Sequence, residues 1–113
     1  MQYNKLVRDK IIEIIEAKGE QARWHIATDK EYKEKLKEKL VEEVQEFVQS
    51  ESREEMADIF EVITALLENK GWKIEEIIAL QKEKRKKRGG FEKKSFLRSH
   101  KCNIIPRLWN YVA

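Results

Sequence analysis

The chain has 113 residues, of which 40% are charged and 41% are hydrophobic. Its length is that of one domain, and its apolar content is too high for a wholly disordered protein. No apolar run approaches the roughly 20 residues of a membrane-spanning helix, and the N-terminal residues lack the apolar core of a secretory signal. A single cysteine, Cys102, cannot form an internal disulfide, which favours a reducing compartment. We therefore expect a soluble cytoplasmic protein without membrane association.

The first half of the chain predicts two helices joined by a connector. Residues 7–18 carry valine and isoleucine at largely helical spacing and stop before Gly19, a residue typical of helix ends. Residues 21–27 alternate in polarity without helix caps, which predicts a short extended connector or strand. Thr28 and Glu31 form a capping box, so we expect a second helix over residues 29–49.

The third predicted helix differs from the others in its apolar character. It spans residues 53–69 after a second capping box, Ser52 with Glu55, and only a thin acidic stripe interrupts its apolar surface. A helix apolar around most of its circumference is buried on more than one side. We expect a second copy of the chain to cover the other side.

The last helix and the tail complete the predicted organisation. A fourth helix should run from about residue 73 to residue 88. Its end, residues 82–88, is strongly basic, and Gly89-Gly90 terminates it. After residue 97 the helical period is lost. We expect one domain at residues 1–97 and a C-terminal tail of unknown role at residues 98–113.

Four carboxylates are predicted to meet between the second and third helices. Glu43 and Glu46 are three residues apart on one helix, and Glu55 and Asp58 are three apart on the next. Residues at this spacing share a helix face, and the short loop predicts an antiparallel hairpin that brings the two pairs to the same height. Gathered carboxylates require cations, and their oxygens suit Mg²⁺, which binds substrate phosphates as well. Such an ion polarises phosphoryl groups and activates water for phosphoanhydride hydrolysis. In so charged a chain, a solvated helix face remains the alternative.

Glu43-x-x-Glu46 followed by Glu55-x-x-Asp58 resembles the signature of the all-α NTP pyrophosphohydrolase (MazG-like) superfamily. Two flanking blocks, YNKLVRDKI from residue 3 and KRKKRGGF from residue 84, resemble its phosphoribosyl-ATP pyrophosphohydrolase-like house-cleaning branch. The likeness covers roughly residues 3–97. It implies an all-α, MazG-like bundle of about four helices that dimerisation completes, with at most a short extended or β segment.

The resemblance also implies an activity. Its four acidic positions, Glu43, Glu46, Glu55 and Asp58, would be catalytic residues and ligands of Mg²⁺, for which Mn²⁺ could substitute. Glu42 and Glu61 would be auxiliary acids. The reaction would convert nucleoside triphosphates, including non-standard or damaged ones, to the monophosphate and pyrophosphate, in a homodimer or higher homo-oligomer. Phosphoribosyl-ATP is the alternative substrate, because motifs do not encode the choice of base.

Basic residues are the expected partners of the substrate phosphates. Lys84 and Arg88 are four apart at the end of the fourth helix, and Lys5, Arg8 and Lys10 are further candidates. A solvated cationic helix end is the alternative, as is a structural pair between Arg8 and Asp9. The alternative function is a non-catalytic nucleic-acid-binding module. The basic run lacks interleaved aromatic residues for stacking on bases, which argues against a nucleic-acid partner.

Overall fold

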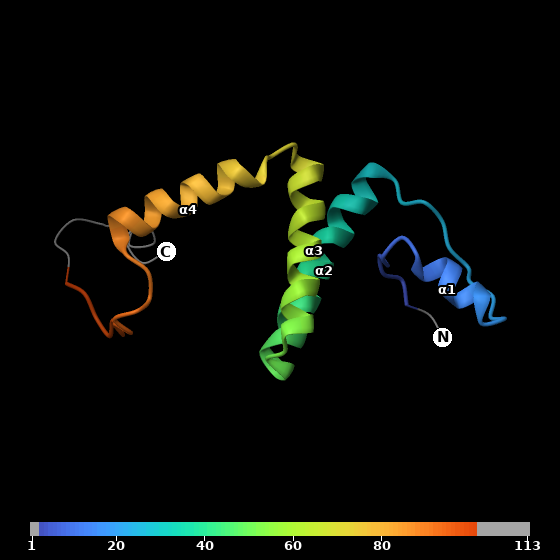
Figure 1. The fold of residues 1–113 in the computed structure, drawn as a ribbon, viewed down its shortest axis with the longest axis horizontal. Helices are drawn as coiled ribbons and strands as arrows, with labels where there is room; N and C mark the ends of the chain where they lie inside the picture. The colour runs from blue at the N-terminus through green and yellow to red at the C-terminus, as the bar shows by residue number, and fades with distance from the viewer. Residues whose placement is uncertain (1–2, 102–113) are drawn as a thin grey trace. The chain divides into compact units, whose positions relative to one another are not determined.

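The computed structural model describes residues 3–101, and all of the regular structure within this range is helical. Its four helices are α1 (Ile11–Ala17), α2 (Asp29–Ser50), α3 (Arg53–Lys70) and α4 (Ile74–Arg88) (Figure 1). The predicted all-α class with about four helices is confirmed. Residues 98–101 of the predicted tail have no regular secondary structure, whereas residues 102–113, with Cys102, lie outside the described residues.

The two capping boxes start α2 and α3 where the sequence predicts. The Thr28 side chain accepts a hydrogen bond of 3.2 Å from the backbone N–H of Glu31, and Ser52 accepts one of 3.2 Å from that of Glu55. Each bond satisfies an amide that has no partner within its helix. α2 ends at Ser50, and the next residue, Glu51, has a left-handed φ of 49°; α3 begins two residues later, at Arg53.

α2 and α3 pack side by side as an antiparallel hairpin (Figure 1). The buried apolar residues of the described chain are Leu36 from α2 and Ile59 and Val62 from α3. The fourth buried position belongs to Glu43, a carboxylate. An acidic side chain is almost never fully buried unless it has a partner, so this position points to the functional site.

The N-terminal region departs from prediction. The first helix begins at Ile11 rather than at residue 7, and turns precede it. Arg8, which was expected inside this helix, instead extends toward Asp58 of α3. Residues 21–27 connect α1 and α2 without helix or strand, so the connector is confirmed and the alternative of a short strand is not.

The chain divides into two compact units between Ala79 and Leu80, within α4. The first unit contains α1, the α2–α3 hairpin and the start of α4. The second contains the basic half of α4 and the residues that follow it. In the part of the chain from residue 3 to residue 101, none of the helices combines the length and apolarity required to cross a membrane.

Candidate metal centre

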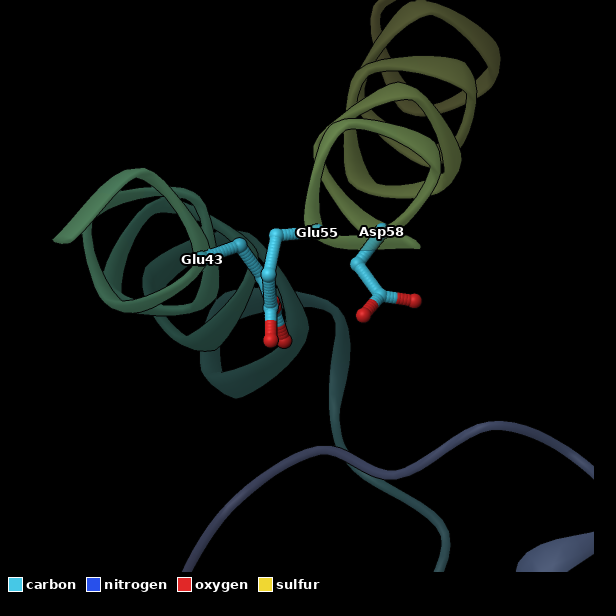
Figure 2. Close-up of side chains that lie close together, drawn as sticks. All are labelled: Glu43, Glu55 and Asp58. Carbon is cyan, nitrogen blue, oxygen red and sulfur yellow. The ribbon is translucent and has the colours of Figure 1, made fainter. Parts of the chain in front are cut away.

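Three carboxylates from the two helices of the hairpin converge at one point. Glu43 of α2 and Glu55 and Asp58 of α3 each present one oxygen, and these three oxygens lie within 4.8 Å of one another (Figure 2). Glu55 is placed by the cap that starts α3, since its own N–H binds Ser52. Asp58 follows three residues later and so projects from the same face.

Two of these side chains carry an orphan oxygen. Glu43 is 7% exposed, and among the described residues neither its Oε2 nor the Oε2 of Glu55, both buried, has a hydrogen-bond partner. A buried charged oxygen without a donor destabilises the fold. The donor set is therefore one that a hard divalent cation such as Mg²⁺ would complete.

The surroundings of Glu43 disfavour its charge. Burial raises the pKa of the Glu43 carboxyl above its ordinary value, and the neighbouring carboxylate of Glu46 raises it further. Lys39, one turn earlier on α2, opposes this shift with its Nζ 3.4 Å from Glu43 Oε1. The centre thus contains more negative charge than its own lysine neutralises.

Glu46, the fourth predicted ligand, occupies a different position. Its side chain is exposed on α2, and it is not among the three residues whose oxygens lie within 4.8 Å of one another. It nevertheless lies close enough to influence the pKa of Glu43. The structure therefore brings together three of the four predicted acids, with the fourth beside them.

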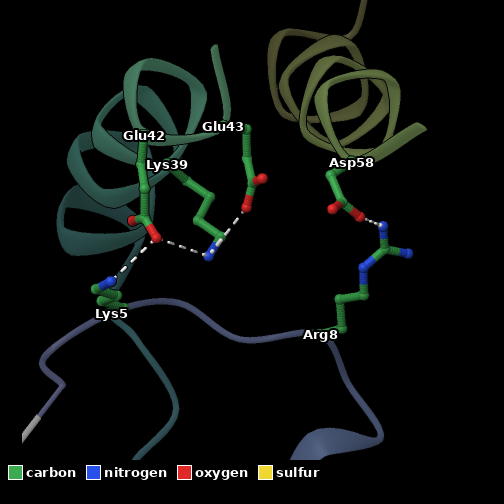
Figure 3. Close-up of polar contacts among 6 residues, drawn as sticks. All are labelled: Lys5, Arg8, Lys39, Glu42, Glu43 and Asp58. Carbon is green, nitrogen blue, oxygen red and sulfur yellow. Dashed lines mark hydrogen bonds and ion pairs between the residues drawn. The ribbon is translucent and has the colours of Figure 1, made fainter. Parts of the chain in front are cut away.

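The N-terminal segment supplies cations to the rim of this centre (Figure 3). Arg8 Nη2 lies 2.7 Å from Asp58 Oδ1, and Lys5 Nζ lies 3.0 Å from Glu42 Oε1. The bond from Lys5 holds the pKa of Glu42 below its ordinary value. Arg8, one of the predicted phosphate contacts, thus pairs with Asp58, and the alternative pairing with Asp9 is not observed.

Lys39 is the residue that the sequence analysis missed. Its Nζ lies 3.6 Å from Glu42 Oε1 and 3.4 Å from Glu43 Oε1, so it bridges two acids of α2 (Figure 3). The signal was present in the sequence, because a lysine three and four residues before glutamates on a helix is placed to pair with both.

The remaining predicted residues do not belong to the group of three carboxylates. Lys10 is exposed just before α1, and Glu61 is exposed on α3. Lys84 and Arg88 belong to the second unit, where they line a shallow surface hollow together with Lys87. Their role as phosphate contacts stays a prediction.

No protein-family model, curated protein or solved structure matches this chain.

Proposed function

We propose that this chain is a Mg²⁺-dependent nucleoside triphosphate pyrophosphohydrolase. The reaction would cleave the bond between the α and β phosphates with water and release the nucleoside monophosphate and pyrophosphate. The observation that carries the proposal is the pair of buried oxygens on Glu43 and Glu55, beside Asp58, that find no hydrogen-bond partner in the described part of the chain. Groups of this kind repel one another unless a cation neutralises them.

Glu43, Glu55 and Asp58 would hold the metal, and we propose Glu46 as the fourth ligand. Bound Mg²⁺, or Mn²⁺ in its place, would neutralise phosphate oxygens and make water a better nucleophile. The basic residues have a separate task, because a triphosphate brings more negative charge than the metal balances. Their candidates are Lys5, Arg8, Lys10, Lys84 and Arg88.

The substrate class is a nucleotide that carries a phosphoanhydride chain. Ordinary, non-standard and damaged triphosphates all present this chain, as does phosphoribosyl-ATP, and the acidic centre would act on it rather than on the base. A panel of these compounds, assayed for pyrophosphate release with Mg²⁺ and with a chelator, identifies the preferred one. Failure of every compound to release pyrophosphate would overturn the proposed function and leave nucleic-acid binding as the next activity to test.

We also propose that the chain works as a homodimer or higher homo-oligomer. α3 leaves Phe60 64% exposed and Met56 and Ile63 38% exposed, and α2 leaves Val41 and Val48 exposed. Several exposed large apolar side chains on a hairpin with so small a core are the kind of surface that a second chain covers. Sedimentation should give a dimer or larger species at micromolar concentration, and Phe60→Glu should dissociate it. A monomeric native chain would contradict this assembly.

A further inference from the structure

The N-terminal segment at residues 4–10, here called the strap, is attached to the acidic centre by its side chains. Its two long-range attachments are the ion pairs of Arg8 with Asp58 and of Lys5 with Glu42 (Figure 3). Within the strap only Leu6 is half-buried, and the other residues are exposed. The backbone hydrogen bonds that involve the strap are local, from Ile11 and Ile14 to carbonyls of Arg8 and Lys10. Two cationic side chains therefore supply much of its hold on the hairpin.

The hold on Asp58 is a reversible one. In this pair the Arg8 side chain is 56% exposed and that of Asp58 is 38% exposed. Ion pairs with such access to water contribute little, because solvent screens the charges and long side chains lose freedom. A partner of higher charge density at the same carboxylate would displace the guanidinium.

The carboxylate of Asp58 is placed to bind either the Arg8 guanidinium or a metal ion. Its carboxylate is one of the three that converge as a candidate metal site, and it is also the group that Arg8 binds at 2.7 Å. A guanidinium at this distance and a divalent ion on the same small carboxylate would repel each other. Binding of the metal ion to Asp58 therefore weakens the Arg8 ion pair, and the ion pair weakens binding of the metal.

We propose that Arg8 is a placeholder cation that exchanges with the metal and then binds the substrate. In the metal-free protein Arg8 neutralises Asp58; the divalent cation displaces it, and the released guanidinium contacts a phosphate of the nucleotide held at the same centre. The planar fork of arginine suits phosphate oxygens. This inference rests on the proposed function for the identity of the ligands, and it gives Arg8 opposite effects on the affinities for the metal and for the nucleotide.

Removing Arg8 should therefore strengthen metal binding and weaken nucleotide binding. Without nucleotide, Arg8→Gln should lower the dissociation constant for Mg²⁺ by about two- to fivefold, the factor that corresponds to an exposed ion pair. With saturating Mg²⁺, the same variant should bind α,β-methylene-ATP, which resists cleavage at the α–β bond, about tenfold more weakly because a charge-assisted hydrogen bond is lost.

Calorimetric titration of the full chain measures both constants. Lys10→Gln is the matched control for the metal titration, because it removes one positive charge from the same strap but no ion pair to the acids. Equal Mg²⁺ affinities for the two variants, or a weaker affinity for Arg8→Gln, would overturn the exchange. If either outcome occurs while the native chain still binds Mg²⁺, the exchange of Arg8 is refuted but the proposed function is not. Absence of Mg²⁺ binding to the native chain would overturn both.

A spectroscopic readout follows Arg8 directly and does not depend on catalysis. The side-chain Nε–H resonance of Arg8, assigned by its loss in Arg8→Lys, should move on Mg²⁺ addition toward its position in Asp58→Asn, where the partner carboxylate is absent. Subsequent α,β-methylene-ATP should move it again. An Arg8 resonance whose chemical shift does not change at Mg²⁺ concentrations that saturate the native chain would contradict the exchange.

Discussion

Replacing Glu43 by glutamine should stabilise the metal-free protein, although it removes a side chain from the proposed active site. Glu43 is 7% exposed, and one of its oxygens lies within 4.8 Å of oxygens from Glu55 and Asp58. At that separation, with an effective dielectric constant of about 20, two like charges repel by about 3 kcal/mol. Arg8 already pairs with Asp58, which leaves Glu55 and the neighbouring Glu46 as sources of repulsion; after burial, the Glu46 carboxylate is the group that raises the pKa of Glu43 most.

An opposing attraction reduces the gain. Lys39 Nζ lies 3.4 Å from Glu43 Oε1, but it is shared with Glu42 at 3.6 Å, so part of the repulsion remains. We expect Glu43→Gln to raise the free energy of unfolding by about 1–2 kcal/mol in chelator. In a chain of this size, such a change raises the Tm by about 5 °C or more.

Thermal unfolding followed by circular dichroism, with chelator and with Mg²⁺, tests this expectation. At a metal concentration of about one hundred times Kd, the native protein gains about 2.7 kcal/mol from binding, which the variant should largely lose. The order of the two Tm values should therefore reverse when Mg²⁺ is added. Glu34→Gln, an exposed position on α2, should leave both values unchanged. If Glu43→Gln is less stable than the native chain in chelator, the claim that repulsion between carboxylates destabilises the metal-free centre is refuted.

The other predictions concern pH, the hairpin cap and the core. Burial and the Glu46 carboxylate raise the pKa of Glu43 in the folded chain. The protonated carboxyl is therefore no handicap below the unfolded pKa, whereas its ionisation destabilises the fold as pH rises through the folded pKa. In chelator, the stability advantage of Glu43→Gln should vanish near about pH 4 and grow as pH rises. Urea titrations across this range would contradict that account if the advantage grew in acid. Ser52→Ala should cost about 1 kcal/mol by removing the cap of α3, measured as a lower urea midpoint, and Ser52→Asn should recover most of it. Val62→Ala should cost about 1–3 kcal/mol through a cavity in a core with few members, and an equal midpoint for both chains would show that this core contributes little.

Local interactions explain the parts of the fold that could be predicted. Thr28 and Ser52 begin α2 and α3 because each side chain accepts a hydrogen bond from an amide three residues ahead, and a four-residue pattern suffices to recognise this. The meeting of Glu43 with Glu55 and Asp58 followed from helix periodicity and a two-residue connection, both of which are also local.

Contacts between distant residues explain the rest. The start of α1 was placed too early because Val7 fits a helical pattern, whereas Arg8 is drawn to Asp58, 50 residues along the chain. Spacing alone did not separate Glu43, which is buried, from Glu46, which is exposed on the same helix face. That difference depends on how α3 packs against α2.

The most direct test of the central claim compares two adjacent glutamates of α3. Glu55 carries a buried oxygen that has no hydrogen-bond partner among residues 3–101, whereas Glu54 is exposed. Both lie in the first turn of α3, where their effects on the helix dipole are similar. Pyrophosphate release from the preferred nucleotide should require Mg²⁺ and should persist in Glu54→Gln. In Glu55→Gln it should fall by about 100-fold, the upper end of the loss seen when a residue that only supports a metal ligand is changed. Equal activity of the two variants, or release that persists in chelator, would contradict a metal centre built on Glu43, Glu55 and Asp58.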